Sequence, residues 1–150
     1  MSIIRPFRAF RPAQDLASSI AALPYDVYDS REARRIVEAK PMSFLKIDRA
    51  ETLLPEGTDI YSKKVYETAR HTLDKMIWDG SFIQDETDCY YVYALTMRGR
   101  TQTGLVGCAS IDDYLNGVIL RHENTLETKE QDRIRHIDAC SAQTLSLIHI

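Results

Sequence analysis

The chain has 150 residues, of which 44% are apolar and 27% charged, a composition typical of a soluble globular domain and unlike collagen, coiled coils or low-complexity disorder. Nineteen Lys and Arg against 22 Asp and Glu give a formal net charge of −3, and the basic residues are dispersed, so we expect neither nucleic acid nor an anionic membrane as a partner. No leader is visible, no apolar run reaches the ~18 residues of a membrane span, and three widely spaced cysteines predict no disulfide or zinc site. These features together predict a cytoplasmic protein.

The first forty residues predict short elements. Ile3–Phe10 reads as a strand interrupted by proline, and Ala13–Ala22 as a brief helix. Asp29 and Glu32 have the spacing of a capping box, in which each side chain bonds the backbone of the other residue. We therefore expect a helix over residues 30–39.

The next forty residues predict one strand and the clearest helix of the chain. The apolar run Ser43–Ile47 favours a buried strand, and a loop is predicted over Asp48–Asp59. Apolar residues then recur at helical spacing over residues 60–78, and Gly80 stands where a helix C-terminal cap belongs.

The second half of the chain is richer in β-favouring residues. Two such runs flank Arg98–Arg100 and predict a hairpin over residues 90–110. An Asn116–Gly117 turn precedes a predicted short strand, Val118–Leu120, and a polar helix follows over residues 125–139. The order of elements predicts a mixed α+β fold in one domain, with at least one helix packed across an antiparallel hairpin.

Polar side chains suited to chemistry concentrate where the last predicted strand meets the last helix. They are Arg121, His122, Glu123, Lys129, Asp132, Arg133 and His136. On a helix the last four fall at i, i+3, i+4 and i+7, so they share one face. The start of a helix also favours an anion, because its backbone donors are free there.

This pattern suits phosphoryl transfer, in which cations hold phosphate oxygens and a carboxylate holds Mg²⁺. Glu123 and His122 are the candidate catalytic residues, with Glu123 as the base, and Asp132 is the candidate metal ligand. The candidate phosphate contacts are Arg121, Lys129, Arg133 and His136. The alternative is a solvated helix face whose charge pairs add only a few tenths of a kcal/mol each.

A second candidate lies in the loop Pro24–Asp29, which contains two tyrosines and two carboxylates. Tyr25 and Asp26 are candidates for the lining of a pocket. The alternative is ordinary turn and cap chemistry ahead of the next helix.

Several sequence blocks, in order from Arg5 to Thr144, resemble the N-terminal half of a bacterial and archaeal family catalogued as domain of unknown function family 1015. The blocks are Arg5–Ala9, Leu23–Val27, Pro41–Leu45, Gly104–Gly107, Asp112–Tyr114, His122–Thr125 and Lys129–His136. The resemblance implies a parent protein with a second half, related to ParB-like free-serine kinases.

By this resemblance the parent is a small-molecule kinase that uses ATP or ADP with Mg²⁺ and phosphorylates a hydroxyl of a free-serine-type substrate. The resemblance also admits a non-catalytic ParB-like nucleotide switch that acts through DNA or a protein partner. A third alternative is a structural module in which Glu123–His136 is only a charged helix. If the C-terminal half of the parent is missing, the chain alone is expected to be inactive.

The last six residues, Leu145–Ile150, are the in-frame translation of a widely used transposase sequencing adapter. We therefore expect residues 1–144 to be the natural N-terminal part of a family-1015-like domain and residues 145–150 to be a non-native tail. A truncated domain is expected to expose apolar surface near the hairpin or the last helix.

Overall fold

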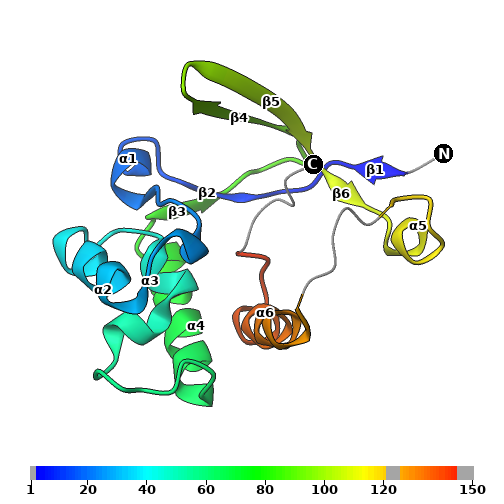
Figure 1. Ribbon diagram of the computed structural model, residues 1–150. Helices are drawn as coiled ribbons and strands as arrows, with labels where there is room; N and C mark the ends of the chain where they lie inside the picture. Colours follow the sequence, from blue (N-terminus) through cyan, green and yellow to red (C-terminus); the bar gives the residue numbers. More distant parts are fainter. Residues whose placement is uncertain (1–2, 121–125, 145–150) are drawn as a thin grey trace. The chain divides into compact units, whose positions relative to one another are not determined.

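The structure is a computed structural model that describes residues 3–120 and 126–144 (Figure 1). These residues form two compact units. The helical unit comprises residues 12–83 and 126–144, and the hairpin unit comprises residues 3–11 and 84–120. No helix in the described ranges combines the length and the apolar character needed to cross a bilayer.

Helices make up the helical unit (Figure 1). In chain order they are α1 (Ala17–Ile20), a 3₁₀ turn (Tyr25–Val27), α2 (Ser30–Ala39), α3 (Leu45–Asp48), a second 3₁₀ turn (Ala50–Leu53), α4 (Lys63–Trp78) and α6 (Glu127–Cys140). Because helices and antiparallel strand pairs occur together, the predicted α+β fold is confirmed.

The hydrophobic core of the helical unit forms around α4. Val65, Ala69 and Leu73 follow one another at i+4 spacing and are buried, as the helical periodicity predicts. Ile47 from α3 and Cys140 from α6 pack into the same core. The core thus holds α3 and α6 around the central helix.

The three predicted long helices are confirmed. Residues 30–39 form α2, and Asp29 caps it with the expected box, in which its side chain accepts from Glu32 N at 2.8 Å while Glu32 Oε2 accepts from Asp29 N at 3.1 Å. The helices predicted over 60–78 and 125–139 correspond to α4 and α6, and the brief helix predicted within residues 13–22 is α1.

The buried strand predicted at Ser43–Ile47 is wrong, because these residues lead into the one-turn helix α3. The backbone N–H of Ile47 donates to Phe44 at 2.9 Å, and that of Arg49 donates to Leu45 at 2.8 Å, which is helical pairing. A short apolar run does not distinguish a buried strand from a buried helical turn. The prediction that the run is buried is confirmed, since Leu45 and Ile47 are at most 1% exposed.

Short antiparallel strands and one helix make up the hairpin unit (Figure 1). They are β1 (Ile4–Arg5), β4 (Tyr91–Met97), β5 (Arg100–Val106), β6 (Cys108–Ala109) and α5 (Ile111–Leu115). β4 pairs with β5, from Met97 opposite Arg100 to Tyr91 opposite Val106, and this confirms the predicted hairpin. β1 pairs with β6. Two further strands, β2 (Phe10–Pro12) and β3 (Phe82–Gln84), pair with each other.

The strand predicted at Val118–Leu120 is also wrong. The backbone N–H groups of Val118 and Ile119 both donate to the carbonyl of Asp113, at 2.8 and 3.0 Å, so this segment folds back onto the end of α5. α5 is a helix that the sequence patterns do not predict, and the Ser110 side chain caps its start.

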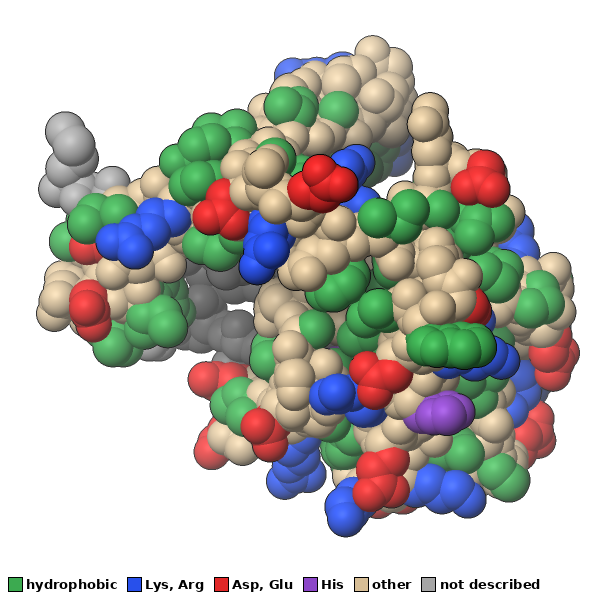
Figure 2. All heavy atoms as spheres, turned by 180° about the vertical axis from the view of Figure 1, so that it is seen from behind, with side chains coloured by type: hydrophobic (Ala, Val, Ile, Leu, Met, Phe, Trp, Pro, Cys, Tyr) green, Lys and Arg blue, Asp and Glu red, His purple; other side chains and the backbone are tan. Residues whose placement is uncertain are grey.

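The described part of the hairpin unit contains no buried residue. Apolar side chains are exposed on both faces of the β4–β5 pair, for example Val92 (73%) on one face and Met97 (68%) on the other. Figure 2 shows further hydrophobic side chains at the surface around α5, at the left of the view. This surface agrees with the expectation of exposed apolar area near the hairpin.

Gly107, between β5 and β6, is the one glycine of the structure that a larger residue would crowd. A Cβ atom there would lie 2.7 Å from Ile4 Cγ2 and 3.1 Å from the carbonyl oxygen of Arg5. We expect Gly107→Ala to destabilise the β1–β6 pairing by about 1–3 kcal/mol, a typical cost of overpacking. Faster hydrogen exchange at the β1 and β6 amides would show this.

Gly104→Ala is the matched control, because a Cβ atom at Gly104 meets nothing within 4 Å. It should leave exchange at the β1 and β6 amides unchanged. Equal exchange rates in the two variants would contradict the steric argument.

Candidate functional site

Three of the predicted site residues, Arg121, His122 and Glu123, lie outside the described residues. Their roles as phosphate contact and catalytic residues stay predictions. Four others belong to α6, and Tyr25 and Asp26 belong to the first 3₁₀ turn; the structure describes the surroundings of all six.

The polar face of α6 is turned inward along most of its length. Lys129, in the first turn, is exposed. The side chains of Asp132 and Arg133 are only 16% and 21% exposed, and His136 is 2% exposed. The alternative of a solvated face therefore describes Lys129 alone among these four, and polar contacts hold α6 against the rest of the helical unit.

His136 joins α6 to α3 from the interior. Its Nε2 atom lies 3.1 Å from the carbonyl oxygen of Ile47, and because a carbonyl only accepts, Nε2 carries the hydrogen. Nδ1 is then the acceptor and lies 3.4 Å from the Thr144 hydroxyl. Burial lowers the pKa of His136 below its usual 6.5, which favours the neutral ring. Both ring nitrogens thus face protein groups, and the arrangement does not present His136 to a phosphate.

Asp132 is enclosed by two partners. Tyr66, on α4, donates its hydroxyl hydrogen to Asp132 Oδ1 at 2.7 Å, and Arg133 donates through Nε to Oδ2 at 3.2 Å. Burial, together with the Asp132 carboxylate, raises the pKa of Tyr66 to about 12.

This surrounding does not fit Mg²⁺ at Asp132, because a guanidinium already occupies the carboxylate. No cluster of three or more His, Cys, Asp or Glu suited to a metal ion occurs within residues 3–120 and 126–144.

Arg133 contacts the loop that the sequence analysis singled out. Its guanidinium carbon lies 4.6 Å from the centroid of the Tyr25 ring, a cation–π contact. Arg49 fixes this loop by donating to the carbonyls of Tyr25 and Tyr28 at 3.1 and 2.9 Å. The structure therefore brings Tyr25 to Arg133, whereas Asp26 is exposed.

Asp48, at the end of α3, is the ionisable group with the most perturbed surroundings near Arg133. Its Oδ1 atom is buried and has no partner among the described residues. Burial raises the pKa of Asp48 to about 7, although a hydrogen bond with Thr144 and the charge of Arg133 act in the opposite direction. A carboxyl group with a pKa near neutrality can take up and release protons under physiological conditions.

We call Tyr25, Asp48, Arg133, His136 and Thr144 the Asp48–Arg133 cluster. Besides Asp48 Oδ1, the Nη1 atom of Arg133 is buried without an acceptor among the described residues. Each such group costs about 1–3 kcal/mol unless a ligand or water supplies its partner. One atom is an acceptor and the other a donor, and both are enclosed by protein atoms, so a ligand with a hydroxyl beside an anionic oxygen pairs with them only if the cluster opens.

The sequence patterns predict neither Asp48 as a site residue nor the role of Tyr66. A loop is predicted at Asp48 because the apolar run before it favours a strand. The one sequence feature that indicates Asp48 as a site residue is its position directly after a buried apolar run. Tyr66 was hidden among the apolar residues that give α4 its periodicity.

A protein-family model described as "Protein of unknown function (DUF1015)" matches residues 4–149. No curated protein and no solved structure matches the chain significantly.

Proposed function

The chain belongs to the DUF1015 family, and on this premise we propose that its parent is a cytoplasmic, nucleotide-using kinase of small molecules of the free-serine type. The observation that carries the proposal is that one cluster contains a buried guanidinium nitrogen and a buried carboxyl oxygen, neither of which has a hydrogen-bond partner within residues 3–120 and 126–144. Phosphoryl transfer to a hydroxyl needs one group of each kind.

In the proposed reaction the cluster opens to the substrates, and Arg133 donates from Nη1 to an oxygen of the transferring phosphoryl group. Its contacts with Tyr25 and Asp132 hold the guanidinium in place, so it does not have to reorganise as charge develops. ATP or ADP is the proposed phosphoryl donor.

Asp48 Oδ1 accepts the proton of the substrate hydroxyl. Its pKa of about 7 suits a base that works near neutral pH. Asp48 is thus a candidate base besides Glu123, and Lys129, exposed on the same helix, remains a proposed phosphate contact.

The proposal includes a second half of the parent protein that supplies further phosphate-handling residues. The exposed apolar faces of the β4–β5 hairpin offer a surface on which such a half can pack. The 150-residue chain alone is therefore expected to be inactive.

The proposal is tested on a longer family member that has the same residues at the positions of Asp48, Glu123 and Arg133. The enzyme is incubated with ATP or ADP, Mg²⁺ and a panel of free amino acids and polyols, and phosphorylated products are detected by mass spectrometry. We expect Asp48→Asn to lower kcat by about 10²–10⁴-fold, as for loss of a general base, and Arg133→Gln by at least about 10²-fold.

Arg35→Gln is the matched control, because Arg35 is exposed on α2 and should not affect turnover. Loss of activity in Glu123→Gln, with full activity in Asp48→Asn, would assign the base to Glu123 instead. Absence of product together with nucleotide-dependent retention of DNA would replace the kinase by the nucleotide switch.

A further inference from the structure

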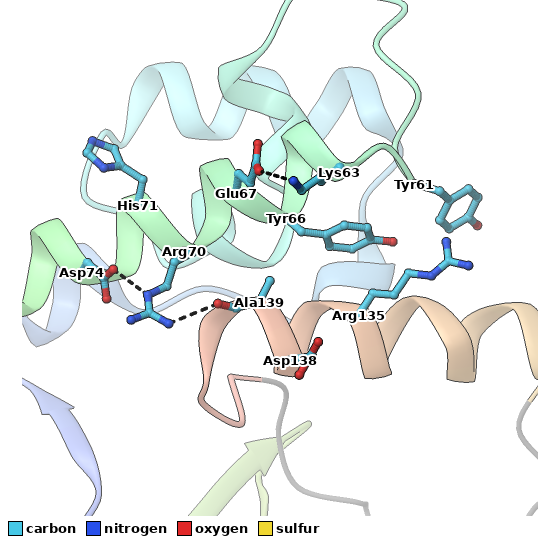
Figure 3. A pocket seen from close by; sticks show the side chains of 10 residues that line it. All are labelled: Tyr61, Lys63, Tyr66, Glu67, Arg70, His71, Asp74, Arg135, Asp138 and Ala139. Atoms are coloured by element: carbon cyan, nitrogen blue, oxygen red, sulfur yellow. Dashed lines mark hydrogen bonds and ion pairs between the residues drawn. The ribbon is translucent and has the colours of Figure 1, made fainter.

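A groove of about 710 Å³ runs between α4 and α6, apart from the buried atoms of the Asp48–Arg133 cluster (Figure 3). Its volume lies within the roughly 300–1,000 Å³ of typical small-molecule sites. Its walls are mainly charged and aromatic side chains, with Ala139 as an apolar contribution from α6. All of them belong to the helical unit.

Two of the cations that line the groove are already neutralised. Lys63 lies 3.3 Å from Glu67, one turn along α4, and Arg70 pairs with Asp74 at 2.5 Å. Arg70 is further fixed by donating to the carbonyl of Ala139 at 3.2 Å. These pairs line the groove and leave little charge for a ligand.

Arg135 is different, because no carboxylate among the described residues pairs with it. It reaches the Tyr66 hydroxyl, and Figure 3 shows its side chain extended toward the rings of Tyr61 and Tyr66. Tyr61 is 47% exposed, so its ring is available to a ligand. An available guanidinium beside two aromatic rings matches a ligand that has a flat ring and a negative charge.

Asp138 lies three residues after Arg135 on α6 and adds a carboxylate to the groove. It too has no ion-pair partner among the described residues, and it lines the same groove. A carboxylate in that place accepts from an amino, imino or hydroxyl group of the ligand.

We propose that the α4–α6 groove binds a planar aromatic ligand whose anionic group is held by Arg135 and whose ring lies against Tyr61 and Tyr66. The ligand carries a hydrogen-bond donor for Asp138. Nucleoside monophosphates and aminobenzoate-like aromatic acids share this chemistry. Binding in the groove does not depend on phosphoryl transfer, so this proposal and the proposed function are tested independently of each other.

The groove is linked to the Asp48–Arg133 cluster by a short path. The Tyr66 hydroxyl interacts with Arg135 on one side and donates to Asp132 on the other, and Asp132 holds Arg133. A ligand anion that draws Arg135 away from Tyr66 therefore changes the surroundings of Asp132, which amide signals near Asp132 will report.

The test is a titration of the 150-residue chain with AMP and with 4-aminobenzoate, followed through amide NMR signals of residues 61–74 and 132–139. Adenosine supplies a ring without an anion, and inorganic phosphate supplies an anion without a ring. We expect one of the ring-bearing anions to bind at least about tenfold more tightly than either part alone. Preference for AMP indicates a nucleotide ligand, and preference for 4-aminobenzoate indicates an aromatic acid.

Arg135→Gln should weaken that binding by roughly ten- to a hundredfold, the usual effect of losing a charge-assisted hydrogen bond. Tyr61→Leu should weaken binding of the ring-bearing anion and leave binding of inorganic phosphate unchanged. Arg35→Gln, on exposed α2, is the control and should bind as the unaltered chain does. Equal affinity in Arg135→Gln, or no shift of groove amides with either ring-bearing anion, overturns the proposal.

Discussion

Replacement of Ile47 by alanine is expected to lower the free energy of unfolding of the helical unit by about 2–5 kcal/mol, the range measured when a large core side chain is truncated. Ile47 is 0% exposed and lies in the core cluster that joins α3, α4 and α6. Its backbone carbonyl also receives the Nε2 hydrogen of His136. A cavity there therefore loosens the contact of α6 with α3 as well as the core itself.

Urea denaturation followed by far-UV circular dichroism measures this effect, because most of the helices belong to the helical unit. Val92→Ala is the control, since Val92 is 73% exposed on the hairpin and should change stability by less than about 0.5 kcal/mol. Similar losses in the two variants would mean that Ile47 is no more important to stability than an exposed position.

The helices were predictable where many residues repeat one pattern. α4 extends over four turns with a consistent apolar stripe, and α2 has an explicit start signal at Asp29. The hairpin was predictable because its two β-favouring runs flank Arg98 and Gly99, both of which adopt positive φ. In each case the local sequence carries the information.

α3 and the segment after α5 were not predictable in this way. α3 is a single turn, and its burial comes from Ile20, Leu73 and other residues distant in the chain. Residues 118–120 turn back because two of their N–H groups find the Asp113 carbonyl. Tertiary contacts decide such short segments, and propensity does not.

For the candidate site, the spacing on α6 predicted which side chains share a face, although not which way that face points. Its inward direction depends on Tyr66, which donates to Asp132, and on Tyr25, whose ring contacts Arg133; both lie on other elements. A polar helix face is usually solvated, so the sequence favoured the wrong surroundings for His136 in particular. Two separate sequence signals singled out Tyr25 and Arg133, but neither predicted the contact between them.

The second large effect concerns pH and Asp48, whose pKa in the folded chain is about 7 against a usual 3.8. Between these two values the folded chain holds a proton that the unfolded chain has released. The stability contributed by this group is therefore complete below pH ~4 and is lost as pH rises through 7, by on the order of 4 kcal/mol in total. His136 acts in the other direction, because its lowered pKa costs stability as pH falls below about 6.5.

Asp48→Asn separates the two contributions, since asparagine keeps the shape of the side chain and does not titrate. The variant should be close to the unaltered chain in stability at pH 3.5 and more stable by several kcal/mol at pH 8, because it avoids placing a charge at the buried Oδ1. Urea midpoints measured from pH 3.5 to pH 8 for both proteins give the difference directly. A difference that is constant with pH would show that Asp48 is charged throughout, and the base proposed for phosphoryl transfer would then lack its neutral-range pKa.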